Sequence, residues 1–185
     1  MIVDLQSGLS IPDDWVTLLK QLQEKDPSAV LAGGAIRDIY CARKPVHDLD
    51  FFVKAGTNAG FSQFRAQGSQ TDYQGMTYVE GIQWYPSALP LPCNVITGSG
   101  YDSVYQLLET FDYGLCQIAF DGMDIIRTGR FDWDYKHGVM TLRLTARQGD
   151  RRDLSLARFE RWREKYPEFT LIEAPIQQED EYDGF

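Results

Sequence analysis

Two glycines and two aspartates lie close together in the first third of the chain. Gly33 and Gly34 follow residues 29–32, an apolar run typical of a short buried strand, and precede a segment typical of a helix. Because glycine has no side chain, such a turn lets an anion approach the backbone amides at the start of a helix. Asp48 and Asp50 flank one residue of a second predicted strand, so both carboxylates point to the same face. Two carboxylates held that close repel each other without a cation, and the spacing therefore predicts a divalent metal site beside a phosphate-binding turn.

Arg37 and Asp38 lie one helical turn beyond the glycines. The guanidinium of Arg37 is expected to bind phosphate oxygens and to act on the triphosphate of a nucleotide rather than on the fold. Each feature alone has an ordinary explanation, because glycine pairs form turns, spaced aspartates occur on solvated strands, and Arg37 and Asp38 could form a surface ion pair. Their combination within about 20 residues favours a nucleotide-binding site.

Residues 31–53, LAGGAIRDIYCARKPVHDLDFFV, resemble the signature of the DNA polymerase beta-like nucleotidyltransferase superfamily. The resemblance is closest to the catalytic domain of CCA-adding enzymes and bacterial poly(A) polymerases, in which the pattern LxGGxxRD is followed by DxD. It covers only about 23 of the 185 residues. The residues that match the pattern are Leu31, Gly33, Gly34, Arg37, Asp38, Asp48 and Asp50.

The resemblance implies a reaction and its cofactor. A nucleoside monophosphate would pass from an NTP to an acceptor hydroxyl, with release of pyrophosphate. Gly33, Gly34, Arg37 and Asp38 would bind the nucleotide. Asp48 and Asp50 would hold two Mg²⁺ ions, for which Mn²⁺ can substitute.

A third carboxylate on a neighbouring strand is common in the superfamily. The candidates are Asp112, Asp121 and Asp124. We favour Asp112 as a catalytic metal ligand, because an aspartate between aromatic residues at a strand start is partly desolvated and needs a cation or a donor. The alternative for Asp112 is an ordinary connector between a helix and a strand. Asp121 is explained by a tight Asp-Gly turn.

Basic residues concentrate in one stretch of an acidic chain. The sequence has 18 Lys and Arg against 27 Asp and Glu, which disfavours binding of nucleic acid over the whole surface. Residues 143–165, however, contain eight basic and only four acidic residues. Residues 151–153 resemble the RRD motif of CCA-adding enzymes, although Ala157 stands where that motif has asparagine; the alternative is an amphipathic helix. We predict that this stretch binds an RNA end, such as a tRNA-like 3′ terminus, through Arg151, Arg152, Arg158, Arg161 and Lys165.

The remaining elements follow from hydrophobic periodicity. We predict helices at 13–24, 34–42, 58–66, 102–109 and 152–166, and strands at 29–32, 48–53, 76–84, 93–97, 115–120, 123–127 and 139–144. Strands mixed with short helices indicate an α+β (α/β-like) fold, a single domain with a mixed sheet flanked by helices. The domain is expected to span residues 1–171, followed by an acidic tail at 172–185 that is extended or disordered.

Composition limits the alternatives. A hydrophobic fraction of 43% excludes a disordered chain, and no apolar run is long enough for a membrane span. Three widely spaced cysteines argue against a disulfide framework, so we expect a cytoplasmic protein without membrane partners. Two other functions stay open: a nucleotidyltransferase that modifies a protein or a small molecule, and a catalytically idle relative that acts as a binding module or inhibitor.

Overall fold

The structure is a computed structural model of the chain. It describes residues 2–4, 9–43, 45–54, 68–69, 77–84, 91–99, 101–144 and 151–175. The helix predicted at 58–66 lies outside the described residues, as does most of the predicted tail. Within the described parts, no helix is both long and apolar enough to cross a membrane.

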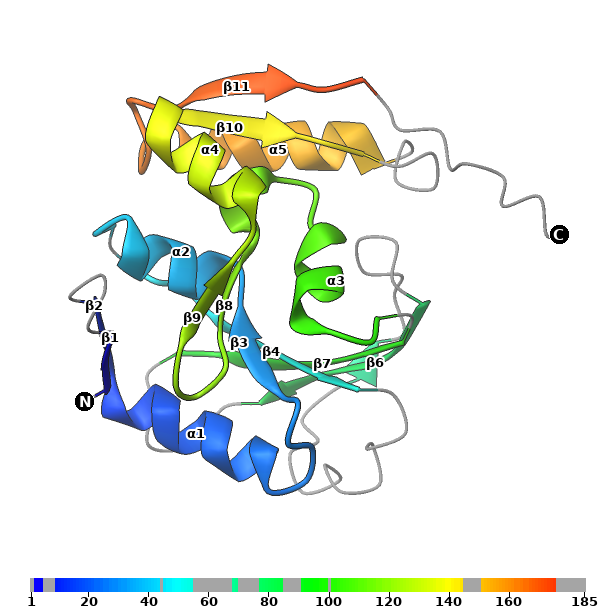
Figure 1. Cartoon of the computed structure of the whole chain (residues 1–185). Coiled ribbons are helices and arrows are strands. Elements are labelled where there is room, and N and C mark those ends of the chain that lie inside the picture. Colours follow the sequence, from blue (N-terminus) through cyan, green and yellow to red (C-terminus); the bar gives the residue numbers. More distant parts are fainter. Residues whose placement is uncertain are drawn as a thin grey trace, which may run out of the picture.

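Seven strands form one mixed sheet, in the order β5-β6-β7-β4-β3-β8-β9 (Figure 1). β4 and β7 are parallel, whereas the other neighbours in this sheet pair antiparallel. This arrangement confirms the predicted mixed sheet. The strands are β3 (Val30–Ala32), β4 (Leu49–Lys54), β5 (Gly68–Ser69), β6 (Thr77–Trp84), β7 (Cys93–Ser99), β8 (Ile118–Phe120) and β9 (Ile125–Arg127).

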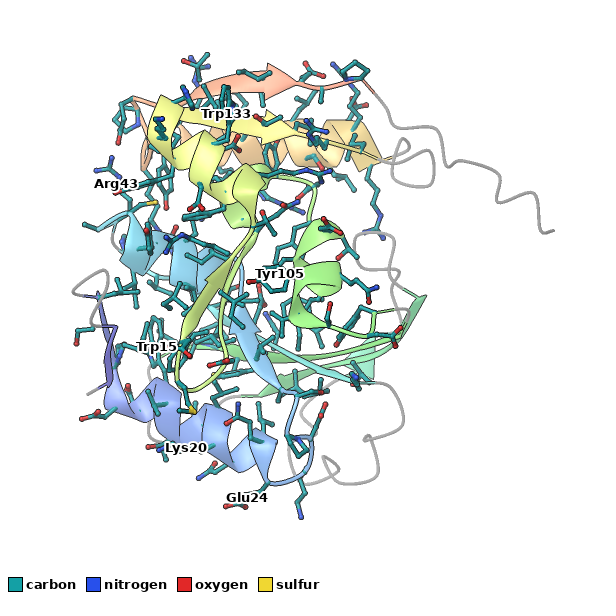
Figure 2. All side chains as sticks on the ribbon, viewed as in Figure 1. Trp15, Lys20, Glu24, Arg43, Tyr105 and Trp133 are labelled. Carbon is teal, nitrogen blue, oxygen red and sulfur yellow. The ribbon has the colours of Figure 1, made fainter. Side chains whose placement is uncertain are left out.

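Helices cover both faces of this sheet. α1 (Asp13–Gln23) lies below it in Figure 1, whereas α2 (Gly34–Tyr40) and α3 (Val104–Glu109) lie above it. The predicted apolar stripe of α1 is buried, and Figure 2 shows Trp15 pointing toward the sheet while Lys20 and Glu24 point away from it. A two-stranded sheet of β1 (Ile2–Asp4) and β2 (Leu9–Ile11) precedes α1.

A further layer lies beyond α2 and contains the last part of the described chain (Figure 1). It consists of α4 (Gly129–His137), α5 (Arg152–Trp162) and a parallel pair of strands, β10 (Val139–Leu142) and β11 (Thr170–Glu173). α4 and β11 were not predicted from the sequence. β11 also runs two residues past the expected domain boundary at residue 171. This layer matters for function because it places α5 opposite the first residues of α2.

The connection between β7 and β8 differs from the prediction at one point. The predicted strand at 115–120 begins only at Ile118, because residues Gly114–Cys116 form a 3₁₀ helix. The predicted hairpin of β8 and β9 is confirmed by their antiparallel pairing. Its turn contains Gly122 with a φ of 101°, a conformation that glycine adopts without strain.

Candidate active site

A cavity of about 800 Å³ opens between the start of α2, the start of β4 and the C-terminal part of α5. It contains the glycine turn and the aspartate pair from one side of the fold, and basic residues from the other. The described residues that line it include Gly33, Gly34, Arg37, Asp38, Asp48, Asp50, Phe111, Arg158, Arg161, Glu164 and Lys165. Segments more than 100 residues apart in the sequence therefore meet at one site.

The glycine turn forms one wall of the cavity. Gly33 has a φ of 78°, and a Cβ on it would lie 3.3 Å from the ring of Phe111. Its own amide donates to the carbonyl of Ile118 (2.8 Å), so the amides next available to an anion are those of Gly34 and Ala35. No side chain caps this end of α2. Both a positive φ and close packing thus require glycine at position 33.

The aspartate pair follows the alternation expected of an extended chain. Asp48, Asp50 and Phe52 line the cavity, whereas the intervening Leu49 and Phe51 do not. Burial, reinforced by the charge of Asp48, raises the pKa of Asp50 to about 7. Partial desolvation also raises the pKa of Asp48, which stays exposed at the mouth of the cavity. An unfavourable pair of charges therefore faces the cavity, as expected of a site that binds a cation.

Arg37 also lines the cavity, but its donors are already engaged. Its Nε and Nη2 donate to Oδ1 of Asp38 (2.9 and 2.7 Å), and Nη1 donates to Sγ of Cys116 (3.1 Å). Its guanidinium carbon lies 4.2 Å from the ring centroid of Trp162. Tyr166 donates to the same oxygen of Asp38 (2.5 Å). Arg37 and Asp38 are thus part of a buried network that ties α2 to the end of α5.

The basic residues predicted to bind an RNA end do not all lie at the cavity. Arg158, Arg161 and Lys165 line it, whereas Arg152 pairs with Glu173 (2.6 Å) outside it and Arg151 is absent from its lining. Lys165 donates to Asp38 and to the carbonyl of Pro45. Within the described chain, Arg161 has no ion-pair partner.

The structure does not bring Asp112 to the aspartate pair. Its carboxylate accepts hydrogen bonds from Oγ of Ser155 (2.6 Å) and from Nη1 of Arg158 (3.0 and 2.9 Å), and it does not line the cavity. Among the residues that the structure describes, no group of three or more His, Cys, Asp or Glu side chains is placed to hold a metal ion. The role of Asp112 as a third ligand therefore stays a prediction, and its hydrogen bonds here go to Ser155 and Arg158. Asp112 is partly desolvated as expected, but its partner is a cationic side chain of α5.

Asn94 on β7 is a site residue that sequence reasoning missed. Its Nδ2 donates to Oδ1 of Asp50 (2.8 Å), and this hydrogen bond lowers the pKa of Asp50 against the effect of burial. The sequence carries no local signal for this contact, because it depends on the register of two strands that are about 40 residues apart.

The fold was compared with known proteins. No protein-family model matches the sequence, and no curated protein matches it. The chain superposes on a CCA-adding enzyme in an apo form with a TM-score of 0.62 and 14% identity, covering 98% of this chain and 43% of that one. It also superposes on the Thermotoga maritima CCA-adding enzyme complexed with tRNA, with a TM-score of 0.57 and 14% identity. That superposition covers 94% of this chain and 41% of the enzyme. A third similar structure is a tRNA nucleotidyltransferase complexed with a primer tRNA and an incoming ATP analogue, with a TM-score of 0.55 and 17% identity. The superposition covers 83% of this chain and 46% of that one.

The chain has the nucleotidyltransferase fold. The resemblance read from residues 31–53 is thereby confirmed at the level of the fold and extends over most of the chain. The chain spans less than half the length of each of these three enzymes.

The donor set of this cavity suits the cation that the resemblance implies. Asp48 and Asp50 offer carboxylate oxygens, the ligands that Mg²⁺ and Mn²⁺ prefer. The raised pKa of both carboxyl groups shows that burial and, for Asp50, the charge of Asp48 disfavour the ionised pair when no cation is bound. Divalent ions would be held by these two residues at the cavity wall.

Two of the three candidates for a third carboxylate, Asp112 and Asp121, can be tested together. We expect Asp112→Asn to lower the free energy of unfolding by about 1.5–3 kcal/mol, because it removes a charge-assisted hydrogen bond to Arg158. Asp121→Asn should change it by no more than about 0.5 kcal/mol, since an amide oxygen can still accept from the backbone of the turn. Urea denaturation measures both. Neither variant should change the affinity for Mn²⁺. If Asp112→Asn alone lowers the Mn²⁺ affinity, Asp112 is a metal ligand.

Proposed function

We propose that this chain transfers a nucleoside monophosphate from an NTP to an acceptor hydroxyl. The acceptor oxygen forms a bond to the α-phosphorus, the bond between the α-phosphorus and the bridging oxygen breaks, and pyrophosphate leaves while the hydroxyl proton passes to solvent. The observation that supports this most is the convergence of the glycine turn, the aspartate pair and the basic residues of α5 on one cavity.

Each group around the cavity has a task in that reaction. The amides of Gly34 and Ala35 would bind phosphate oxygens, and the absence of a side chain at Gly33 and Gly34 leaves room for them. Asp48 and Asp50 would hold Mg²⁺, which when bound polarises the acceptor hydroxyl and offsets the charge of the leaving pyrophosphate. Arg161 offers a cation to the triphosphate or to the acceptor.

An RNA 3′ end is the proposed acceptor. Two of the enzymes with a similar fold are described in complex with tRNA, and α5 presents Arg158 and Arg161 at the cavity wall. The contact area is small and the chain is acidic overall, so binding should be weak and its salt dependence shallow, on the order of two to four phosphates.

The proposal is tested by labelling. The protein is incubated with each radiolabelled NTP, with Mg²⁺ or Mn²⁺, and with a mixture of total tRNA and protein. Label in RNA that depends on a free 3′ hydroxyl supports the proposal. If only protein or a small molecule is labelled, the acceptor is that molecule and not RNA. If no NTP gives any label, the transfer reaction itself is contradicted.

A charge reversal at Arg161 tests whether α5 binds substrate. We expect Arg161→Glu to weaken binding of NTP or RNA at least tenfold, because it places a carboxylate where an anion should bind. Arg163→Glu is the matched control: Arg163 is on the same helix end, is 65% exposed, pairs with Glu160 and does not line the cavity. It should change binding no more than about twofold. Filter binding at fixed salt measures both; equal losses would indicate only a general effect of net charge.

A further inference from the structure

The parallel pairing of β4 and β7 places Asn94 directly beside Asp50. The two residues are partners in the strand register, so their side chains project from the same face of the sheet. The amide of Asn94 spans the gap and donates to one oxygen, Oδ1, of the Asp50 carboxylate. The other oxygen of Asp50 has no hydrogen bond from Asn94, and the residue lines the cavity.

No described carboxylate takes the place next to Asp50 that Asn94 occupies. Asp112 is held by Ser155 and Arg158 instead, away from the cavity lining. The position beside Asp50 is therefore filled by a neutral donor. A neutral donor there has a specific effect, because its hydrogen bond to Oδ1 orients the carboxylate of Asp50 without adding a charge.

We infer that Asn94 is a positioning residue for the metal ligand Asp50, within a site that holds its cation by the carboxylates of Asp48 and Asp50. This inference rests on the proposed function. By its hydrogen bond to Oδ1, Asn94 restricts the rotation of the Asp50 side chain, which would hold the ion. A carboxylate at position 94 would be a third ligand at the same place in the sheet.

Two substitutions at position 94 have opposite expected effects on cation binding. Asn94→Ala removes the hydrogen bond that orients Asp50 and should weaken Mn²⁺ binding about tenfold, as is usual when a metal ligand loses its orienting partner. Asn94→Asp has nearly the same shape but adds a charge next to the ion, and it should tighten Mn²⁺ binding about tenfold. A purely structural role would lower stability in both variants and leave the affinity unchanged.

The experiment measures Mn²⁺ affinity of the full chain by the electron paramagnetic resonance signal of the free ion. Gln117→Ala is the matched control, because Gln117 is a buried amide outside the cavity that donates to the carbonyl of Phe111 and accepts from Thr128. It should lower the melting temperature without changing Mn²⁺ affinity. Unchanged affinity in Asn94→Ala, or no gain in Asn94→Asp, would overturn the inference.

The result separates this inference from the proposed function. If the wild-type chain binds no Mn²⁺, the metal site of the proposed function fails, and the role of Asn94 fails with it. If the wild type binds Mn²⁺ and both Asn94 variants bind it equally well, only the role of Asn94 is wrong. Melting temperatures of all three variants show whether each has folded before its affinity is compared.

Discussion

We expect Asp50→Asn to abolish nucleotide transfer and yet to make the ion-free protein more stable at pH 8. The loss of activity follows from removal of a charge that the metal needs, and should reach about a thousandfold, which corresponds to about 4 kcal/mol of transition-state stabilisation. The gain in stability follows from the electrostatics of the empty pair, because the carboxylate of Asp50 is half-buried and lies close to the charge of Asp48.

The pH dependence of this gain has a definite sign. The pKa of Asp50 is about 7 in the folded chain, above the ordinary value of 3.8, so the folded state binds a proton more tightly than the unfolded state. The free energy of unfolding of the wild type therefore falls as the pH rises from about 4 to about 7. Asparagine cannot ionise, and its oxygen can still accept from Asn94. The free energy of unfolding of Asp50→Asn should exceed that of the wild type by nearly zero at pH 4 and by on the order of 2 kcal/mol at pH 8.

Asp26→Asn is a control for the substitution itself. Asp26 is also buried, but its carboxylate accepts from the amide and hydroxyl of Ser28 and from the amide of Lys54. Replacing one of its oxygens with an amide group breaks part of this set, so Asp26→Asn should lower stability. Thermal denaturation between pH 4 and pH 8 compares the two variants. A loss of stability in Asp50→Asn at pH 8 would contradict the assignment of a repelling pair.

The pair of aspartates could be predicted because its geometry is local. Alternation along a single strand determines that Asp48 and Asp50 share a face, and the order of strand, glycine pair and helix determines where the turn lies. Contacts between segments that are far apart in the sequence could not be predicted in this way. The hydrogen bond from Asn94 to Asp50 requires the register of β4 and β7, and the partner of Asp112 lies on α5.

The missed helix α4 has a physical explanation. Only Phe131 and Asp134 are buried among its residues, whereas Trp133 and Tyr135 are exposed, so its sequence has no clear apolar stripe. Its ends are instead fixed by capping: the hydroxyl of Thr128 accepts from the amide of Phe131, and Gly138 ends the helix with a φ of 63°. Such signals become informative only once the position of the helix is known.

Arg37→Ala is expected to destabilise the fold by about 3–5 kcal/mol, which differs from the sequence-based expectation of a residue that acts on the triphosphate. Arg37 is only 3% exposed, and it donates two hydrogen bonds to Asp38, which is also buried. Removing the guanidinium leaves the Asp38 carboxylate buried with Lys165 as its remaining ion-pair partner. The loss of one member of a buried ion pair typically costs this much.

A double-mutant cycle with Asp38→Asn measures the coupling directly. Each single variant should be destabilised, and the double variant should be destabilised by less than the sum of the two, because the penalty of the unpaired charge then disappears. Arg127→Ala is the control: Arg127 packs on the ring of Tyr40 and pairs with the exposed Asp132, so its loss should cost no more than about 1 kcal/mol. Urea denaturation gives all four free energies. If Arg37→Ala unfolds at the wild-type urea concentration and only its NTP affinity falls, then Arg37 binds phosphate and the buried network does not stabilise the fold.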